Sequence, residues 1–233
     1  MTQHRTRLII ARVAAMVLLI QALSGCQKPR DPGFVGAWLD YTPNMSGTIY
    51  LPSPTGLFGV GTDGKGWLHR GNGGERFALP LASGQVIYRI FFDDYQGDPL
   101  FVYECGEFDG GIGHVVRLDK VSLSVEWRAD IPGGNIMEPL LRGHFLYVTG
   151  IGTVGKIDVR TGVYVWQIKG LYRMVRTHGA YNAFDKPILK GRTVIFPESS
   201  IDVEKGQAAS LLKLIVDDRT GTVIAGTVPP QER

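Results

Sequence analysis

The segment Phe145–Trp166 constrains the fold of this chain more than any other stretch. It has the sequence FLYVTGIGTVGKIDVRTGVYVW: two short apolar runs joined by glycine, the turn Asp158–Gly162, and a third run that ends in Trp166. Short apolar runs rich in β-branched and aromatic residues and bounded by glycine are typical of buried strands. Aspartate and glycine at these turn positions favour a hairpin. We therefore predict three antiparallel strands, with Trp166 filling a gap between sheets and its indole N–H bound to an acceptor.

Related units occur on both sides of this segment. Downstream, Asp217–Gly221 repeats the turn with the sequence DDRTG, after two apolar runs. Upstream, Asp119 follows a strand-like run and Trp127 closes the unit, but Thr-Gly is missing from the turn. The turn aspartates Asp119 and Asp158 are 39 residues apart, and Asp158 and Asp217 are 59 apart because of an insert at 198–207. Such periods are typical of propeller blades and other repeat folds.

A fainter first unit covers Gly33–Leu81. Its expected strands are Thr48–Leu51, Leu57–Val60 and Gly66–His69. Beyond the first residues, no segment shows helical periodicity over three turns. The sequence therefore predicts an all-β fold.

Three of these segments resemble the repeat of PQQ-like, or quinoprotein-dehydrogenase-like, β-propellers. In that repeat a strand ends in Leu-Asp, two residues and Thr-Gly follow, and a last strand ends in Trp. Ile157–Trp166 matches it well, Val216–Gly221 lacks the Trp, and Leu118–Trp127 lacks the Thr-Gly. The resemblance, which covers Ile87–Gly226, implies a β-propeller of about four blades of roughly 40–50 residues each. A partial ring completed by another chain, or five short blades, are the alternatives.

The first 25 residues have the features of a secretory signal. Three arginines precede the short apolar run Val13–Ile20, which is too short to span a bilayer. Leu23–Cys26, with the sequence LSGC, resembles the lipobox of bacterial lipoproteins. That resemblance implies cleavage before Cys26 and its acylation; the alternative is an ordinary signal peptide. We expect a signal at 1–25, a tether at 26–33 and a repeat domain at 34–233.

Charge and cysteine content restrict the function. The expected signal carries three of the 25 basic residues and none of the 22 acidic ones, so the mature chain would have no net charge. Bulk charge therefore gives no indication of nucleic-acid binding. With Cys26 acylated, Cys105 is the remaining cysteine. No basic residue or His flanks it to stabilise a thiolate, so we expect it to be buried and inert.

The most polar region is Asp93–Asp109, which holds several carboxylates near glycine. Calcium prefers such oxygen ligands, but the spacing lacks the alternating acids of the known loop. A carboxylate pair could instead hydrolyse glycosidic bonds, with Asp93, Glu104 or Glu107 as members. No spacing selects a pair, and acids on turns and surfaces are the simpler interpretation. No two histidines have the spacing of metal ligands on one element, so we expect no metal.

A long connection, Gly170–Lys186, carries the best candidates for partner binding. They are Tyr172, Arg173, Arg176, Tyr181 and Phe184. Aromatic residues with arginine are typical of protein contact surfaces, and long connections on rigid scaffolds often carry recognition residues. The alternative is that these residues cover the end of a blade.

These features predict a lipid-anchored, non-catalytic binding module in the bacterial envelope, with an envelope protein as its partner. Family members that are also lipoproteins include the propeller subunit of the outer-membrane barrel-assembly machine. Gln27 after Cys26 favours, by resemblance to such lipoproteins, an outer-membrane location facing the periplasm. We expect no PQQ and no other cofactor, because none of the quinone-site residues maps onto this sequence. The alternative function is a carbohydrate-active hydrolase.

Overall fold

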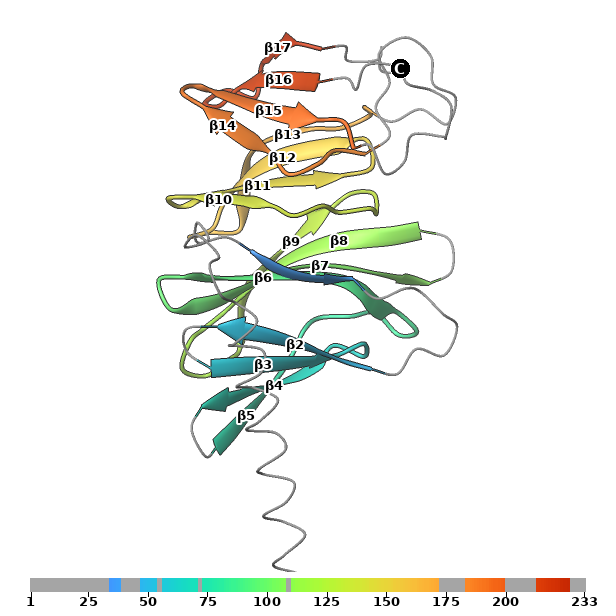
Figure 1. Cartoon of the computed structure of the whole chain (residues 1–233), viewed down its shortest axis with the longest axis vertical. Coiled ribbons are helices and arrows are strands. Elements are labelled where there is room, and N and C mark those ends of the chain that lie inside the picture. The colour runs from blue at the N-terminus through green and yellow to red at the C-terminus, as the bar shows by residue number, and fades with distance from the viewer. Residues whose placement is uncertain are drawn as a thin grey trace, which may run out of the picture. The chain divides into compact units, whose positions relative to one another are not determined.

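Every secondary-structure element among the described residues is a β-strand (Figure 1). The computed structural model describes residues 34–38, 47–53, 56–70, 73–107, 110–171, 183–199 and 213–226. Their strands form four antiparallel sheets, and in each sheet strands that follow one another in sequence are hydrogen-bonded neighbours. This up-and-down order is that of a propeller blade. The predicted all-β fold of about four propeller blades is therefore confirmed.

Each blade contains four consecutive strands. Blade 1 consists of β2 (Thr48–Ser53), β3 (Gly56–Gly61), β4 (Lys65–Arg70) and β5 (Gly73–Ala78). Blade 2 consists of β6 (Val86–Tyr95), β7 (Asp98–Glu107), β8 (Gly110–Leu118) and β9 (Val125–Ile131). Blade 3 consists of β10 (Leu140–Arg142), β11 (Phe145–Gly150), β12 (Thr153–Asp158) and β13 (Val163–Ile168). Blade 4 consists of β14 (Ile188–Lys190), β15 (Thr193–Pro197), β16 (Lys213–Asp217) and β17 (Val223–Ala225).

The first strand in sequence does not belong to blade 1. β1 (Val35–Trp38) pairs antiparallel with β6, so blade 2 has a fifth strand. All four strands of blade 1 therefore lie between β1 and β6 in the sequence. No local feature of the sequence indicates this pairing. The three strands expected in the first unit are present as β2, β3 and β4, and β5 is an additional strand.

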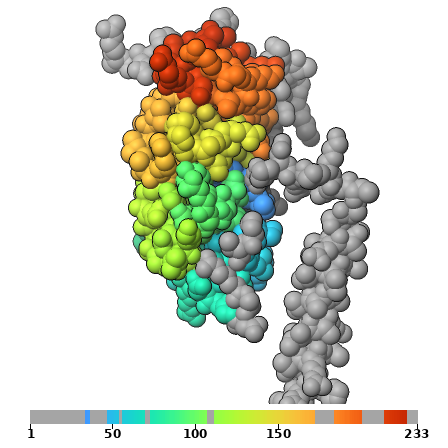
Figure 2. All heavy atoms as spheres, turned by 90° about the vertical axis from the view of Figure 1, so that its left-hand side faces the viewer, coloured from blue at the N-terminus to red at the C-terminus, as the bar shows by residue number. Residues whose placement is uncertain are grey.

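Apolar clusters hold neighbouring blades together. One cluster joins blades 1 and 2, a second joins blades 2 and 3, and a third joins blades 3 and 4. Within the described ranges no cluster joins blade 4 to blade 1. The colours of Figure 2 accordingly follow sequence order from blade 1 to blade 4. The described blades therefore form an open series with one uncovered sheet face at each end.

The turn that the sequence singled out is built around its aspartate. The Asp158 carboxylate accepts a hydrogen bond from the Arg160 backbone N–H at 3.0 Å and a second from the Arg160 guanidinium. The backbone N–H of Gly162 donates to the Asp158 carbonyl at 2.8 Å. Gly162 has a φ of +72°, a left-handed conformation that favours glycine. The carboxylate of Asp217 and the φ of +74° at Gly221 repeat this turn in blade 4.

Each glycine of these turns lies against a tryptophan of the preceding blade. Trp166 of blade 3 donates its indole N–H to the Asp218 carbonyl of blade 4 at 2.8 Å. Lys156, which pairs with Trp166 across β12 and β13, donates to the same carbonyl at 3.0 Å. A Cβ at Gly221 would lie 2.7 Å from the Trp166 side chain. The predicted acceptor for Trp166 is therefore a backbone carbonyl of the next blade.

The junction between blades 2 and 3 has the same arrangement. Trp127 and Arg117, which pair across β8 and β9, donate to the Val159 carbonyl at 3.0 and 3.1 Å. A Cβ at Gly162 would lie 2.6 Å from the Trp127 ring. We call this set of one cation, one tryptophan, one carbonyl and one glycine the interblade stitch.

The junction between blades 1 and 2 lacks the stitch. Leu123 occupies the turn position that glycine holds in blades 3 and 4, and it adopts a φ of +53°. Its backbone N–H still donates to the Asp119 carbonyl, so the turn is kept without Thr-Gly. The Leu123 side chain is buried in the cluster that joins blades 1 and 2. Blade 1 has Phe77 near the end of its last strand, and Leu123 supplies apolar volume at a junction without tryptophan.

Candidate functional site

Blade 1 buries one face of its sheet, and no other described sheet covers the opposite face. Along β2, Ile49 and Leu51 are buried whereas Tyr50 between them is 60% exposed. Phe58 and Leu68 of β3 and β4 lie in the cluster shared with blade 2. Since side chains alternate between the two faces of a strand, Tyr50 points away from blade 2.

A row of side chains crosses all four strands on this uncovered face. The strand registers pair Tyr50 with Gly59, Gly59 with Trp67, and Trp67 with Arg76. A Cβ at Gly59 would lie only 2.5 Å from the Trp67 ring, so the absence of a side chain lets the indole lie directly on β3. Leu57 and His69, a second cross-strand pair, lie beside this row. We define the blade 1 face as Tyr50, Leu57, Trp67, His69 and Arg76.

The aromatic rings of the blade 1 face are nearly perpendicular to one another. The Tyr50 and Trp67 ring centroids are 6.2 Å apart with an interplanar angle of 80°, and those of Trp67 and His69 are 6.2 Å apart at 87°. Tyr50 adjoins Trp67 across the strands, and His69 follows Trp67 by two positions along β4. The Tyr50 and His69 rings are therefore both nearly perpendicular to the indole, and the three rings together form a corner.

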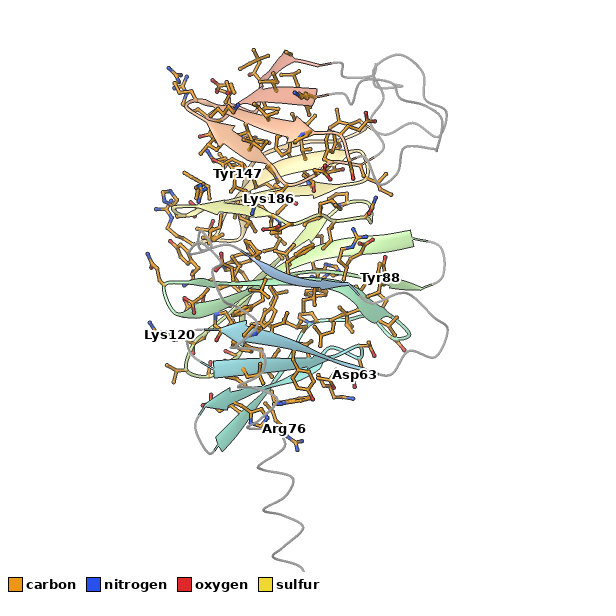
Figure 3. The ribbon with its side chains drawn as sticks, viewed as in Figure 1. Asp63, Arg76, Tyr88, Lys120, Tyr147 and Lys186 are labelled. Atoms are coloured by element: carbon orange, nitrogen blue, oxygen red, sulfur yellow. The ribbon has the colours of Figure 1, made fainter. Side chains whose placement is uncertain are left out.

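A groove of about 1090 Å³ adjoins part of this face and extends to Phe77 and to Val86 of blade 2, whereas Tyr50 and Leu57 do not line it. Trp67, His69 and Arg76 line it, together with the ion pair between Lys65 and Asp63, whose charged atoms are 2.7 Å apart. The two hydrogen bonds from Lys65 lower the pKa of Asp63, so this pair contributes no net charge at neutral pH. Figure 3 shows Arg76 and Asp63 on blade 1. Aromatic side chains beside an arginine in an open groove are the residue types that dominate binding at protein interfaces.

Most of the binding residues predicted from the sequence lie outside the described residues. These are Cys26, Tyr172, Arg173, Arg176 and Tyr181. Phe184 is described, and it is fully buried in the cluster between blades 3 and 4, 6.1 Å from the Phe196 ring. Its position corresponds to the alternative interpretation, in which apolar residues of this connection cover the end of a blade. Phe184 therefore adds no exposed aromatic surface.

Two of the acids considered for glycoside hydrolysis are described in full, and they do not form a pair. Asp93 is opposite Leu100 and Glu104 is opposite Arg89 in the β6–β7 register. The two positions are four residues apart along β6, which corresponds to about 13 Å at the usual rise of ~3.3 Å per residue. Paired catalytic carboxylates in glycosidases lie roughly 5–9.5 Å apart. Burial raises the pKa of Asp93, with a further contribution from the charge of the adjacent Asp94, whose carboxylate accepts a hydrogen bond from the Gly97 backbone N–H.

Glu104 has a structural role. Its buried carboxylate accepts hydrogen bonds from the Tyr88 hydroxyl at 2.8 Å and from the backbone N–H groups of Asn135 and Ile136. The Arg89 guanidinium lies 3.6 Å away and donates to the Asn135 side chain and the Ile136 carbonyl. Glu104 and Arg89 thus fix the connection from blade 2 to blade 3. Burial and the negative charge of Glu104 raise the pKa of Tyr88, which stays a hydrogen-bond donor.

The other sequence expectations for chemistry concern metals and thiols. Among the described residues, no three His, Cys, Asp or Glu side chains are grouped so that they could hold a metal ion. Cys105 is fully buried, and burial raises the pKa of its thiol to about 11. The prediction that Cys105 is buried is therefore confirmed, and the raised pKa disfavours the thiolate. No helix of the described part of the chain is long and apolar enough to span a membrane.

Comparisons with known proteins give weak likenesses only. No protein-family model and no curated protein sequence matches the chain. The structure resembles the WD40 domain of Neurospora crassa Pan2 with 13% identity and a TM-score of 0.44, over 84% of this chain and 59% of that domain. It resembles the tricorn protease with 11% identity and a TM-score of 0.44, over 85% of this chain and 18% of that one. BamB from Moraxella catarrhalis gives 11% identity and a TM-score of 0.30, over 82% and 80%.

The chain thus spans less than two thirds of the first two of these structures. Identities and TM-scores this low carry no argument about activity or partners. The assignment of four propeller blades rests on the order of the strands in each sheet and on the apolar clusters between sheets.

Proposed function

We propose that this chain is a non-catalytic scaffold that binds a partner protein through the blade 1 face. The observation that carries the proposal is the row of Tyr50, Trp67 and Arg76 across an uncovered sheet face. Tyrosine, tryptophan and arginine are enriched among the residues that contribute most to binding at protein interfaces. Trp67 and Arg76 lie on hydrogen-bonded strands, so little backbone freedom is lost when a partner docks.

The cellular setting of this proposal comes from the sequence. Leu23–Cys26 supports a lipoprotein anchored through Cys26, and Gln27 supports sorting to the outer membrane with the repeat domain in the periplasm. Acylation at more than one position would hold the domain stably at the membrane surface. We assign the blades to PQQ-like repeats on the same footing, supported by the Asp158 turn and by Trp166 on the next blade's carbonyl.

The decisive experiment is crosslinking in intact cells followed by purification of the native lipoprotein. We expect one envelope protein to be recovered repeatedly with the natural chain and to be lost with Trp67→Ala. Val163→Ala is the matched control, because Val163 is 64% exposed on β13 and lies outside the blade 1 face. Equal recovery with Trp67→Ala and with the natural chain would overturn the assignment of the binding surface.

The anchor has its own test. In Cys26→Ser, we expect the mature form to be released from the membrane fraction. A mature Cys26→Ser protein that stays with the membrane contradicts lipid anchoring through this residue. Glycoside hydrolysis, the second function considered from the sequence, is not proposed, because Asp93 and Glu104 are too far apart and Glu104 accepts three hydrogen bonds and pairs with Arg89.

A further inference from the structure

The blade 1 face carries an uncompensated positive charge. Arg76 is exposed, and within the described residues it has no ion pair or hydrogen bond. The nearby Lys65 is neutralised by Asp63. A guanidinium presents its N–H groups as a planar fork that matches a carboxylate, and such charge-assisted pairs are strong for hydrogen bonds. The face is therefore complementary to a negatively charged group.

The charge lies directly beside the apolar part of the face. Trp67 and Arg76 are cross-strand partners on β4 and β5, and such partners have Cβ atoms roughly 4.5–5.5 Å apart. Tyr50 lies two strands farther from Arg76 than Trp67 does. One bound segment can therefore place an apolar side chain in the corner of Tyr50, Trp67 and His69 while an adjacent carboxylate meets Arg76.

The length of the row indicates the size of the segment. Four strands at a spacing of about 4.8 Å place Tyr50 and Arg76 about 14 Å apart, which is the length of about four residues of extended chain. The groove of about 1090 Å³ is large enough for several side chains. We propose that the blade 1 face recognises a short extended segment of a partner protein in which a carboxylate neighbours an aromatic or aliphatic residue. This inference rests on the proposed function and specifies its partner.

A second copy of this chain fits the face less well. Its uncovered end would be the outer face of blade 4, where Ile188, Ile195 and Ile215 form a cross-strand row. Lys190 and Lys213 lie on the same face, because each is two positions from one of these isoleucines along its strand. Docking of blade 4 on blade 1 would thus bring the exposed Lys190 to the interface with Arg76, whereas the Asp217 carboxylate on that face is engaged by backbone N–H groups of its own turn; like charges are unfavourable across an interface.

The experiment uses three fluorescent peptides of the pattern Gly-X-Phe-X-Gly-Ser, in which X is Glu, Gln or Lys. Binding to the full mature chain is followed by fluorescence anisotropy at up to about 1 mM protein, since a segment this short gives weak affinity. We expect the Glu peptide to bind at least about tenfold more tightly than the Gln peptide. In Arg76→Glu the preference should reverse toward the Lys peptide.

Arg142→Glu is the control, because Arg142 is an exposed arginine on β10 of blade 3. It should leave the preference for the Glu peptide unchanged. Binding that does not distinguish Glu from Lys, an equal effect of Arg142→Glu, or no binding of any peptide overturns the inference. So does a dimer of the natural chain that Trp67→Ala converts to a monomer. None of these results decides the proposed scaffold function, which is tested separately by the Trp67-dependent recovery of an envelope protein.

Discussion

The junction between blades 1 and 2 is packed differently from the two junctions that flank blade 3. At the two junctions that flank blade 3, Trp127 and Trp166 each lie on a turn glycine of the next blade. Each indole N–H and a neighbouring cation donate to the same backbone carbonyl of that blade. At the junction between blades 1 and 2, the rings of Phe58 and Phe77 of blade 1 pack on Phe101 of blade 2. One kind of junction combines directional hydrogen bonds with burial, whereas the other depends on an aromatic cluster.

The difference shows that the repeat is organised between blades. A turn has glycine where the preceding blade supplies a tryptophan, and it has Leu123 where the preceding blade supplies none. In blade 4, the last described blade, Ile215 and Ala225 occupy the positions of the cation and the tryptophan. The residue at the turn position, glycine or leucine, thus depends on whether the preceding blade supplies a tryptophan.

The largest effect is expected at the aromatic junction. Phe58 is fully buried, with its ring centroid 4.8 Å from that of Phe92 and 5.5 Å from that of Phe101. Phe58→Ala should lower the free energy of unfolding by about 3–5 kcal/mol, because it leaves a cavity between two blades. Urea unfolding followed by circular dichroism measures the change. Tyr50→Ala, at an exposed position of the same blade, should change it by less than about 0.5 kcal/mol; similar losses for the two variants would contradict this account of the junction.

The stitch is tested at its glycine. Gly162→Ala should cost about 3 kcal/mol, of which roughly 1–2 come from the left-handed backbone and the rest from displacement of the Trp127 ring. Gly143 has a φ of +60° with no atom within 4 Å of its Cβ position, so Gly143→Ala should show the backbone cost alone. In a Trp127→Ala background the cost of Gly162→Ala should fall to that of the control. Additive costs in urea unfolding would mean that the glycine does not serve the tryptophan.

A smaller effect is expected where leucine replaces glycine. Leu123→Ala and Leu123→Gly both lose the buried atoms beyond Cβ, but only glycine relieves the φ of +53°. Leu123→Gly should therefore be more stable than Leu123→Ala by about 1 kcal/mol, the reverse of the usual order. Val121, exposed in the same turn and without a positive φ, provides the comparison: there alanine should equal or exceed glycine in stability. Thermal unfolding of the four variants decides between the two orders.

The smallest effect concerns the turn aspartates. Hydrogen bonds from Arg160 lower the pKa of Asp158 from its usual 3.8 to about 2. The unfolded chain therefore binds this proton at a higher pH than the folded chain does, so stability is lost as pH falls from about 4 to about 2. Because the site is open to solvent, the loss should stay below about 1 kcal/mol. Unfolding measured across this range should show a shallower acid decline in Asp158→Asn; an unchanged decline would assign the acid sensitivity to other carboxylates.

The sequence predicted the fold better than the site. Phe145–Trp166 gave three strands and a turn in the right places because strand periodicity, glycine and aspartate act locally. The pairing of β1 with β6 involves residues far apart in sequence and has no local signal. The sequence also could not explain why blade 2 lacks the Thr-Gly of the turn. The turn glycine packs on a tryptophan of the preceding blade, and a comparison of repeat sequences does not show contacts between blades.

The blade 1 face was missed for a related reason. Tyr50, Trp67 and Arg76 are separated by turns in the sequence, and only the strand register places them in one row. The sequence of β2 gives no local signal either, because Ile49, Tyr50 and Leu51 are all large apolar or aromatic residues and only the structure shows that Tyr50 is exposed. The sequence instead directed attention to the long connection at 170–186, where Phe184 is buried.

The crossover of β1 determines where a mechanical load would enter the domain. A pull on the chain before Val35 reaches the fold through the hydrogen bonds between β1 and β6, which lie on blade 2. Tension from a tether at this end would therefore be carried by the five-stranded sheet and would bypass blade 1. Because Val86 at the start of β6 also lines the groove beside Trp67, force on the tether and occupancy of this groove would be coupled through β6.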